Sequence, residues 1–505
     1  PSISTTTAIE SPIETRNNAS ARLVGEARSA TMKASAMPSA SKAVMTWGVV
    51  SSGTGRCYRR RSPYGLHRRA GATTIPSSRP LGPPGPGPEA AARNQGSFMA
   101  SGRKDGRILI YGHDTFGLGH LRRCRAIAHS LVERFKNLSV LILSGSPIIG
   151  SFDFRARVDF VRIPGVIKLR NGEYTSLNLH LDIEQTLSMR ASLIRHTAEI
   201  FDPDVFIVDK EPVGLRGEVL ETLEMLKGRG TRLVLGLRDV MDEPRLLVPE
   251  WKRKNVLPAL RDIYDEIWIY GLPQICNPLE GISLPLSVRQ KMVYTGYLHR
   301  EVPTDGAPPR LPEITRSPYL LVTTGGGGDG EGLVEWVLRA YEHDPLLPYP
   351  ALFVLGPFMQ PERQAEFLDR AARLKRVDMI TFHGHLETLV ARAAGVVAMG
   401  GYNTFCEVLS LDKRALIVPR TAPRREQYIR ASRAAALGLV SLLADDGRYD
   451  GAVMAAALRQ MPRQNRPSEV IVPGLLEGLR NVSRLLAPSI EKTQEAAPQS
   501  QAHSA

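Results

Sequence analysis

The sequence predicts an α/β protein in which two doubly wound, Rossmann-like domains face a common cleft. Three observations predict this fold. Short β-rich runs alternate with amphipathic helical stretches from Arg107 onward, a proline-rich break interrupts them at 299–317, and a second series of the same kind follows. Strands that alternate with helices form parallel sheets covered on both faces. Because ligands of such sheets bind at the carboxyl ends of the strands, we expect the functional site in the cleft.

Seven β-rich runs, separated by amphipathic stretches, make up the first series. The clearest helix is expected at 121–135, where apolar residues recur at the spacing of one helical face. The runs of the first series are Ile108–Tyr111, Val140–Leu143, Val158–Ile163, Val205–Val208, Leu233–Leu237, Ile267–Tyr270 and Met292–Thr295. Those of the second series are Tyr319–Thr323, Leu352–Leu355, Met379–Phe382, Val396–Met399 and Leu416–Val418.

Five segments follow from these patterns and from composition. Residues 1–104 are basic and rich in Pro, Gly and Ser, and we expect them to be disordered because they hold too few apolar residues to form a core. We interpret 1–98 as dispensable or upstream-translated sequence, with a targeting segment or a basic interaction arm as alternatives. The other segments are an N-terminal Rossmann-like domain at 105–298, a linker at 299–317, a C-terminal Rossmann-like domain at 318–487 and a disordered tail at 488–505.

The net charge of +14 first suggests nucleic acid or an anionic membrane as partner. Its distribution argues against nucleic acid, because the first 98 residues carry +9 and the other 407 carry only +5. The second group also shows no basic-aromatic pattern. Weak peripheral contact with a membrane stays open as an alternative, carried by the stretch Trp251–Lys254.

Cysteine usage and hydropathy indicate the compartment. The four cysteines lie far apart, with neither paired nor zinc-binding spacing. No run of 18 apolar residues predicts a membrane-spanning helix. We therefore expect a cytoplasmic protein with reduced thiols, whose contact with a membrane, if it has one, is peripheral and at the inner face.

The loop after the first strand carries two histidines and an aspartate within eight residues, His113, Asp114 and His120. Its glycines, Gly117 and Gly119, allow a tight turn, and the start of the following helix favours an anion. Neither the third glycine of a dinucleotide fingerprint nor the lysine of a P-loop is present. A tight turn with incidental polar residues is the alternative to a catalytic loop.

The loop after the first strand of the second series contains four consecutive glycines, Gly325, Gly326, Gly327 and Gly328. Such a loop exposes backbone N–H groups and lets a diphosphate lie against the chain. A flexible turn is the alternative. The equivalent position in a second α/β domain favours the diphosphate.

A third glycine turn, Gly400-Gly401, leads into a helix through Asn403 and Thr404, and Glu407 lies one turn further on. The carboxylate of Glu407 could accept hydrogen bonds from both ribose hydroxyls of a nucleotide. Alternatively, Glu407 and Thr404 form a capping box, in which Glu407 bonds back to the N–H of the cap residue. The local sequence leaves both interpretations open.

The fourth element is the loop 419–427, which follows the strand at 416–418. Gln427 can bind sugar hydroxyls and Arg420 can pair with a phosphate, while a solvated helix start is the alternative. Further arginines near these loops are expected to meet a diphosphate: Arg122, Arg123, Arg424 and Arg425.

In this order the four elements resemble the glycosyltransferase-B fold, in particular enzymes related to the lipid II-forming N-acetylglucosaminyltransferase of peptidoglycan synthesis. The similarity is greatest to a branch of predicted glycosyltransferases with the loop His-Asp-Thr-Phe-Gly-Leu-Gly-His, which stands at 113–120. The resemblance covers residues 105–487. In the second domain it is carried by the spacing from Gly401 to Glu407 and by the later Pro419 and Glu426-Gln427.

This resemblance implies a hexosyltransferase whose donor is a nucleotide-diphosphate sugar, most simply a UDP-sugar, and whose hydroxyl acceptor stays unidentified. It makes 105–298 the acceptor domain and 318–487 the donor-binding domain. On the donor side it implies Glu407 for the ribose, Gly325–Gly328 with Asn403 and Thr404 for the diphosphate, and Gln427 for the sugar. Two departures leave the donor sugar open, because Gly327-Gly328 replace a usual Ser-Gln and Glu426-Gln427 replace His-Gln.

On the acceptor side, the resemblance implies that His120 faces the reacting centre, as base or as a donor to the diphosphate. Asp114, His113 and Asp209 are the other candidate bases. Asp209, which ends a strand, has the capping of the next turn as its alternative role.

We expect an inverting transfer without a metal or other cofactor, because backbone amides and arginines can stabilise the leaving diphosphate. Asp202-Pro203-Asp204 spells the D-x-D of metal-dependent transferases, but it precedes its strand and so predicts a turn.

Two other function classes share the expected architecture. A nucleotide-sugar 2-epimerase would use the carboxylates and histidines of the first domain to move a ring proton and would need no acceptor cleft. A non-catalytic nucleotide-sugar-binding protein would keep only the site of the second domain.

Overall fold

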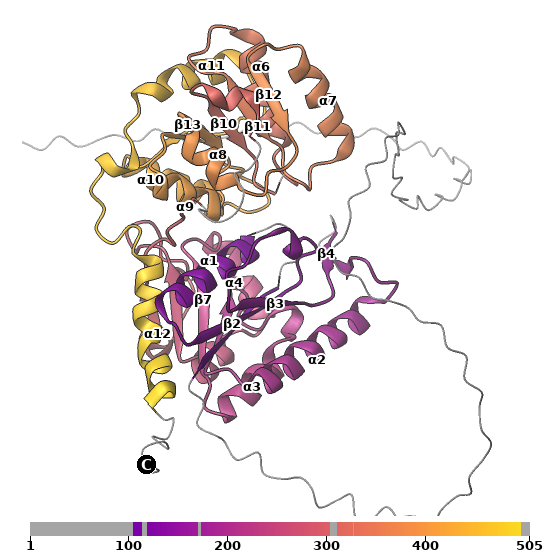
Figure 1. The fold of residues 1–505 in the computed structure, drawn as a ribbon, viewed down its shortest axis with the longest axis vertical. Coiled ribbons are helices and arrows are strands. Elements are labelled where there is room, and N and C mark those ends of the chain that lie inside the picture. Colours follow the sequence, from indigo (N-terminus) through magenta and orange to yellow (C-terminus); the bar gives the residue numbers. More distant parts are fainter. Residues whose placement is uncertain (1–104, 114–118, 170–172, 303–310, 327, 496–505) are drawn as a thin grey trace, which may run out of the picture. The chain divides into compact units, whose positions relative to one another are not determined.

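A computed structural model of the chain describes residues 105–113, 119–169, 173–302, 311–326 and 328–495. Within these ranges two parallel β-sheets are each covered by helices (Figure 1). The predicted α/β class is thereby confirmed. The basic segment 1–104, the centre of the expected linker at 303–310 and the end of the expected tail at 496–505 lie outside the described residues.

The first sheet has seven parallel strands in the order β3-β2-β1-β6-β7-β8-β9. Its strands are β1 (Gly106–Gly112), β2 (Leu138–Ser144), β3 (Val158–Arg162), β6 (Val205–Asp209), β7 (Arg232–Arg238), β8 (Glu266–Tyr270) and β9 (Met292–Tyr294). The helices of this part are α1 (Gly119–Arg134), α2 (Ile183–Phe201), α3 (Leu220–Gly228), α4 (Pro244–Arg253) and α5 (Leu286–Arg289). A separate antiparallel hairpin joins β4 (Val166–Lys168) to β5 (Tyr174–Ser176).

The second sheet has six parallel strands in the order β12-β11-β10-β13-β14-β15. Its strands are β10 (Leu320–Thr323), β11 (Ala351–Val354), β12 (Val377–Ile380), β13 (Gly395–Ala398), β14 (Ala415–Ile417) and β15 (Ser441–Leu442). The helices that follow β10 in the chain are α6 (Glu331–His343), α7 (Pro361–Ala372), α8 (Leu386–Arg392), α9 (Tyr402–Ser410), α10 (Glu426–Ala436), α11 (Gly451–Gln460) and α12 (Gly478–Glu495). The last of them, α12, packs on the first sheet.

Strand β1 shows why the first sheet is buried on both faces. Its residues Ile108 to Tyr111 are fully buried and alternate between two apolar cores. Ile108 and Ile110 pack on the side of α1 and α12, whereas Leu109 and Tyr111 pack on the side of α2 and α3. Figure 1 shows α2 and α3 side by side on one face. A parallel strand between two helical layers is apolar at its central positions, as Ile108 to Tyr111 are here.

Helix α12 corrects the expected end of the ordered chain. The sequence predicted a disordered tail from Pro488, but α12 continues through this proline to Glu495. Its apolar residues Val482, Leu486 and Ile490 pack into the same core as β1 and α1. The tail was predicted from its polar composition and one proline. The helix forms nevertheless, because its apolar face packs into the core.

Both sheets reverse their strand order at one point, between β1 and β6 in the first and between β10 and β13 in the second. Gly112 pairs in register with Asp209, and Thr323 with Ala398. The loops after these strands therefore begin side by side. In open parallel sheets this reversal is where ligands bind.

One buried ion pair joins the two sheets. Asp239, which follows β7, accepts hydrogen bonds from Arg430 of α10 at 2.7 and 2.6 Å, and both side chains are almost completely buried. The hydroxyl of Tyr297 also donates to Asp239 at 2.7 Å. Arg430 in turn donates to the carbonyl of Gly400 at 3.0 Å. The carboxylate thus connects the first sheet to the glycine turn after β13.

We expect Arg430→Met to lower the free energy of unfolding by about 3–5 kcal/mol, because it leaves the carboxylate of Asp239 buried without its cation. The control is Arg433→Met, the same change on an exposed position of the same helix, for which a change within about 0.5 kcal/mol is expected. Urea unfolding of both variants measures the difference. Equal losses for the two variants would show that the ion pair is not required.

Candidate active site

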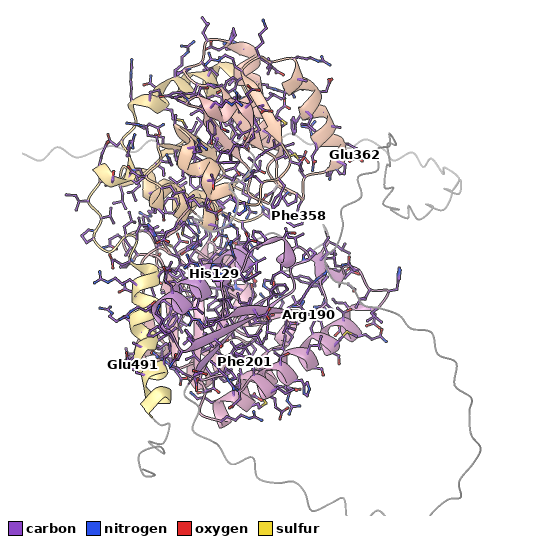
Figure 2. The ribbon with its side chains drawn as sticks, in the orientation of Figure 1. His129, Arg190, Phe201, Phe358, Glu362 and Glu491 are labelled. Atoms are coloured by element: carbon purple, nitrogen blue, oxygen red, sulfur yellow. The ribbon has the colours of Figure 1, made fainter. Side chains whose placement is uncertain are left out.

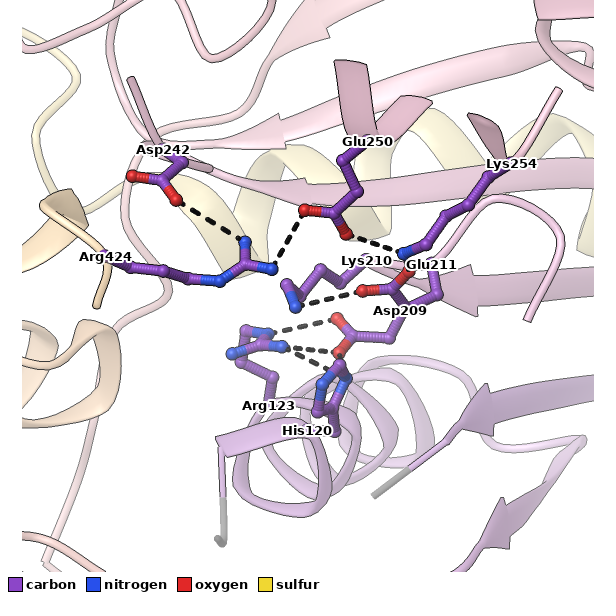
Figure 3. A network of polar contacts seen from close by, with 9 residues as sticks. All are labelled: His120, Arg123, Asp209, Lys210, Glu211, Asp242, Glu250, Lys254 and Arg424. Carbon is purple, nitrogen blue, oxygen red and sulfur yellow. Dashed lines mark hydrogen bonds and ion pairs between the residues drawn. The ribbon is translucent and has the colours of Figure 1, made fainter. Parts of the chain in front are cut away.

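His120, Asp209 and Arg123 meet where β1 and β6 end (Figure 3). His120 and Arg123 lie in the first turn of α1 and Asp209 is the last residue of β6. The Nδ1 of His120 is 2.6 Å from Oδ2 of Asp209. Arg123 donates to the two oxygens of the same carboxylate at 3.0 and 2.5 Å. Asp209 thus serves both a histidine and an arginine.

The charge state of Asp209 decides its role. Burial by itself would raise the pKa of this carboxyl, but the charge of Arg123 and the hydrogen bond from His120 hold it well below its ordinary value. An ionised Asp209 accepts a hydrogen bond from the Nδ1–H of His120, which leaves Nε2 as the basic nitrogen. Asp209 is therefore an orienting residue. Neither its candidacy as the base nor its role as a simple turn cap describes this geometry.

His113 lies beside His120, with the ring centroids 4.5 Å apart in an edge-to-face contact. Burial lowers the pKa of His113 well below 6.5, and the neighbouring His120 adds to this effect. Its carbonyl accepts a hydrogen bond from Arg190, whose buried guanidinium also binds Glu218 (Figure 2). His113 is therefore a neutral neighbour of His120. Asp114 and Gly117, two further predicted site residues, lie outside the described residues.

A cavity of about 1140 Å³, the larger of two that share wall residues, opens beside His120. Its wall comes mostly from the first sheet and its loops, and it includes Gly119 and His113. The wall is strongly charged. Lys210 donates to Glu211 at 3.0 Å, and Lys254 donates to Glu211 at 2.8 Å (Figure 3). This cavity suits a polar ligand.

The smaller cavity, of about 450 Å³, lies at the carboxyl ends of β10 and β13. Three of the four glycines that are expected to hold a diphosphate, Gly325, Gly326 and Gly328, line it, whereas Gly327 lies outside the described residues. Gly325 has a φ of 71°, in the left-handed region. At Gly356 a side chain would meet the backbone of Gly326 at 2.6 Å, so the loop needs a glycine partner. Exposed backbone of this kind accommodates phosphates.

Helix α9 starts at the same cavity, which Asn403 and Thr404 line. The amide of Asn403 already has two partners. Its Oδ1 accepts from Arg300 at 3.0 Å and its Nδ2 donates to the carbonyl of Gly119 at 3.2 Å. The side chain of Asn403 is thereby held in place, and the backbone N–H groups of this helix start favour an anion.

Glu407 is the predicted site residue whose placement differs most from expectation. It is fully buried behind the cavity wall and forms an ion pair with Arg122 of α1. Arg122 also donates to Glu387 at 2.7 Å. The capping-box interpretation is wrong, because α9 is capped by Gly401 and the carboxylate of Glu407 contacts Arg122. Its other oxygen has no hydrogen-bond partner among the described residues.

Burial raises the pKa of Glu407 from 4.5 to about 7, and Arg122 reduces but does not cancel this effect. Glu387, which shares the same guanidinium, has a lowered pKa, because Arg122 outweighs its own burial. One cation thus serves two carboxyl groups, and Glu407 is the one that holds a proton near neutral pH.

Arg420 and Gln427 occupy the fourth predicted loop and line the smaller cavity. Arg420 donates to Glu426 at 2.5 Å and lies 3.0 Å from Asp329. Its backbone N–H donates to Oε1 of Gln427 at 3.1 Å. Gln427 is thereby held at the start of α10, with its amide at the cavity.

The arginines that were expected near a diphosphate are mostly engaged elsewhere. Arg424 donates to Glu250 at 2.9 Å and Arg425 donates to Glu243 at 2.6 Å, both on the first-sheet side. Arg122 and Arg123 have the carboxylate partners described above. These carboxylates compete with a ligand for the arginines, and contact of the arginines with a diphosphate stays a prediction.

Sequence reasoning missed the roles of Arg122, Arg123, Glu387 and Arg238 as site residues. A signal existed for Arg123, which lies three residues after His120 and so shares its helix face. Arg238 ends strand β7, where the carboxyl-end rule could have found it. Nothing local identifies Glu387, which meets Arg122 only through the tertiary structure.

Asp202-Pro203-Asp204 forms a turn, as predicted. Asp202 ends α2 with a φ of 48°, and Asp204 accepts from the N–H of Arg107 at 2.7 Å. Among the described residues, no three His, Cys, Asp or Glu side chains form a metal-binding group. Whether the reaction uses a metal stays a prediction.

The stretch Trp251–Lys254 exposes two cations, Lys252 and Arg253, but not its tryptophan. Trp251 is only 6% exposed and packs in the core of the first sheet, while Lys254 pairs with Glu250 at 2.7 Å. The aromatic side chain is therefore withdrawn from any surface. No helix in the described part of the chain is long and apolar enough to cross a membrane.

Comparisons with known proteins agree with this geometry. No known family profile matches the chain. A protein of Methanosarcina mazei with the name uncharacterized glycosyltransferase is 24% identical over 334 residues, which cover 62% of this chain and 78% of that protein. A UDP-glucosyltransferase from Polygonum tinctorium has a similar structure, with a TM-score of 0.51 at 12% identity, over 78% of this chain and 99% of that one. A UDP-GlcNAc 2-epimerase from Neisseria meningitidis is 13% identical and has a TM-score of 0.49, over 76% of this chain and 100% of that one.

At these identities, structural likeness defines the fold. The chain has the glycosyltransferase-B fold, as the resemblance predicted. The relative from Methanosarcina mazei is itself described as a glycosyltransferase.

Because its pKa is raised, Glu407 contributes stability that is fully present below its unfolded-state pKa of about 4.5 and is lost as the pH rises through 7. We expect Glu407→Gln to remove this loss. Between pH 4.5 and 8, the free energy of unfolding of the variant should therefore rise by about 1–3 kcal/mol relative to that of the wild type. Urea unfolding at several pH values measures this difference. Glu335→Gln is the control. The pKa of Glu335 is lowered, so its contribution to stability is lost as the pH falls instead of as it rises. Parallel pH profiles of Glu407→Gln and the wild type would contradict the assignment.

Proposed function

We propose that the chain transfers a hexosyl group from a nucleotide-diphosphate sugar, a UDP-sugar, to a hydroxyl acceptor, with inversion and without a metal or other cofactor. The observation that carries this proposal is the His120–Asp209 contact of 2.6 Å, at the wall of a cavity that adjoins the glycine-lined one. A histidine held by an ionised carboxylate is a general base.

In this mechanism the donor lies in the smaller cavity and the acceptor in the larger one. The two cavities share wall residues: Gly119, Arg123, Arg238, Arg420 and Glu426. The sugar would stand between them, with the acceptor on one side and the diphosphate on the other. This arrangement supports displacement from the back and therefore inversion.

Each bond change has a group to support it. Nε2 of His120 takes the proton of the acceptor hydroxyl while its oxygen bonds to the anomeric carbon, and the bond from that carbon to the diphosphate breaks. Asp209 stabilises the imidazolium that forms. The N–H groups of the glycine loop and of the start of α9 stabilise the departing diphosphate.

Glu407 would bind the ribose hydroxyls in its ionised form. Its carboxylate is paired with Arg122, so nucleotide binding would replace this guanidinium at one oxygen or share the carboxylate with it. The oxygen that has no described partner is the one available for sharing. Gln427, at the edge of the same cavity, would bind the sugar.

The cavity of about 1140 Å³ beside His120 favours transfer over the 2-epimerase alternative, which needs no acceptor space. The oriented histidine likewise favours catalysis over simple binding of a nucleotide-sugar.

The full chain incubated with a panel of nucleotide-sugars and followed by proton NMR tests the proposed activity. Slow release of free nucleoside diphosphate is expected, because water can replace the acceptor. His120→Ala should lower this rate about 100- to 10,000-fold and keep nucleotide binding, since only the base is lost. Asp209→Asn should lower the rate as well, because it upsets the tautomer of His120.

His129→Ala is the matched control for this experiment. His129 lies on the same helix but accepts a hydrogen bond from the N–H of Arg155, away from both cavities (Figure 2). Its rate should equal that of the wild type. Sugar interconversion without release would indicate the epimerase, and saturable binding without turnover would indicate the binding protein.

Glu407→Gln should weaken UDP binding at least about tenfold, because an amide accepts only one of the two ribose hydrogen bonds without charge. Calorimetric titration with UDP at pH 8, where Glu407 is ionised, measures this. Glu335→Gln, a buried change of the same kind outside the cavities, should bind like the wild type. Undiminished binding by Glu407→Gln would remove Glu407 from the ribose site.

A further inference from the structure

Arg238 is a cation at the junction of the two cavities. It ends strand β7 and is part of the wall of both cavities. Arg238 is half-buried, and its Nε is buried without a hydrogen-bond partner. The charges of Glu426 and Asp239 act on its guanidinium, but no carboxylate among the described residues is in ion-pair contact with it. Burial lowers the pKa of Arg238 to about 10, so the group is still charged at neutral pH.

The neighbouring arginines do not share this condition. Each has a carboxylate partner: Arg122 has Glu407, Arg123 has Asp209, Arg420 has Glu426, Arg424 has Glu250 and Arg430 has Asp239. A guanidinium withdrawn from water without an anion destabilises the fold. Such a position therefore fits a group that receives its anion from a ligand.

A second cation stands next to it. Lys210 follows β6, the strand beside β7, and Asp209 pairs in register with Gly236. Lys210 lines the larger cavity, 3.0 Å from Glu211. Burial lowers the pKa of Lys210, and the charges of Arg238 and Arg424 add to this effect, beyond what Glu211 offsets. The single carboxylate of Glu211 is also shared with Lys254 at 2.8 Å.

We propose that Arg238 and Lys210 bind an anionic group of the acceptor, a carboxylate or a phosphate, so that the acceptor of the transfer is an acidic molecule. The assignment of the larger cavity to the acceptor rests on the proposed function. His120 lies in the same wall, so an anion held by these two cations places a nearby hydroxyl at the base.

The donor diphosphate is the other source of such an anion, because Arg238 also lines the smaller cavity. The acceptor is favoured for two reasons. Lys210 lines only the larger cavity, and the diphosphate already has the glycine loop and the start of α9.

The test is calorimetric titration of the full chain, first with UDP and then with inorganic phosphate at saturating UDP. The wild type is expected to bind phosphate while UDP is bound. Arg238→Gln should weaken phosphate binding at least about tenfold and leave UDP binding within about twofold, and Arg238→Lys should be intermediate because it keeps the charge but loses the fork. The unliganded Arg238→Gln protein should melt no lower than the wild type, since a cation without a partner is removed.

Arg253→Gln is the matched control, because Arg253 lines the same cavity but is exposed to solvent. It should bind phosphate within about twofold of the wild type. An equal loss of phosphate affinity in Arg253→Gln and Arg238→Gln would show that only the overall positive charge matters, and it would overturn the proposal. Weaker UDP binding by Arg238→Gln, with no phosphate bound to the UDP-loaded wild type, would assign Arg238 to the donor and also overturn it. If the wild type binds no UDP but binds phosphate, and this binding is lost in Arg238→Gln, the proposed function is contradicted while the anion site is supported.

Discussion

The buried ion pair between Asp239 and Arg430 is the contact on which the site depends. It lies between the two sheets, and the same arginine binds the carbonyl of Gly400, where the turn into α9 begins. Tyr297, which donates to Asp239, also packs against Tyr402 and Phe405 of α9, with ring centroids 6.0 and 5.1 Å apart. A charged pair sealed by aromatic rings tolerates little displacement. It thereby holds the start of α9, which lines the smaller cavity, against the first sheet.

Most positive charge around the cavities is internally balanced. Arginines of one sheet reach carboxylates of the other, as Arg122 does with Glu407 and Arg425 with Glu243. These pairs stabilise the arrangement of the two sheets and leave little charge for a ligand. Arg238 differs from them because it has no such partner, and this contrast, not the number of arginines, is what points to an anion.

Local sequence patterns predicted the elements well where one element alone decides the outcome. Strand β1 and helix α1 follow directly from continuous apolar residues and from the helical stripe after Leu121. The glycine turns were predicted at the correct strand ends, since their position depends only on chain order. The prediction of a disordered tail was wrong because the apolar face of α12 packs against the first sheet, which is far away in the sequence.

The sequence by itself determined the α/β class, the alternation of strands and helices, and the loops that carry His120, the glycines and Glu407. It did so because hydrophobic period and glycine position act over a few residues. Only the tertiary structure decided that Asp209 contacts His120, that Glu407 faces Arg122 instead of a helix cap, and that Nε of Arg238 is buried without a hydrogen-bond partner among the described residues. These outcomes depend on which charges burial brings together across two sheets, and no local pattern records that pairing.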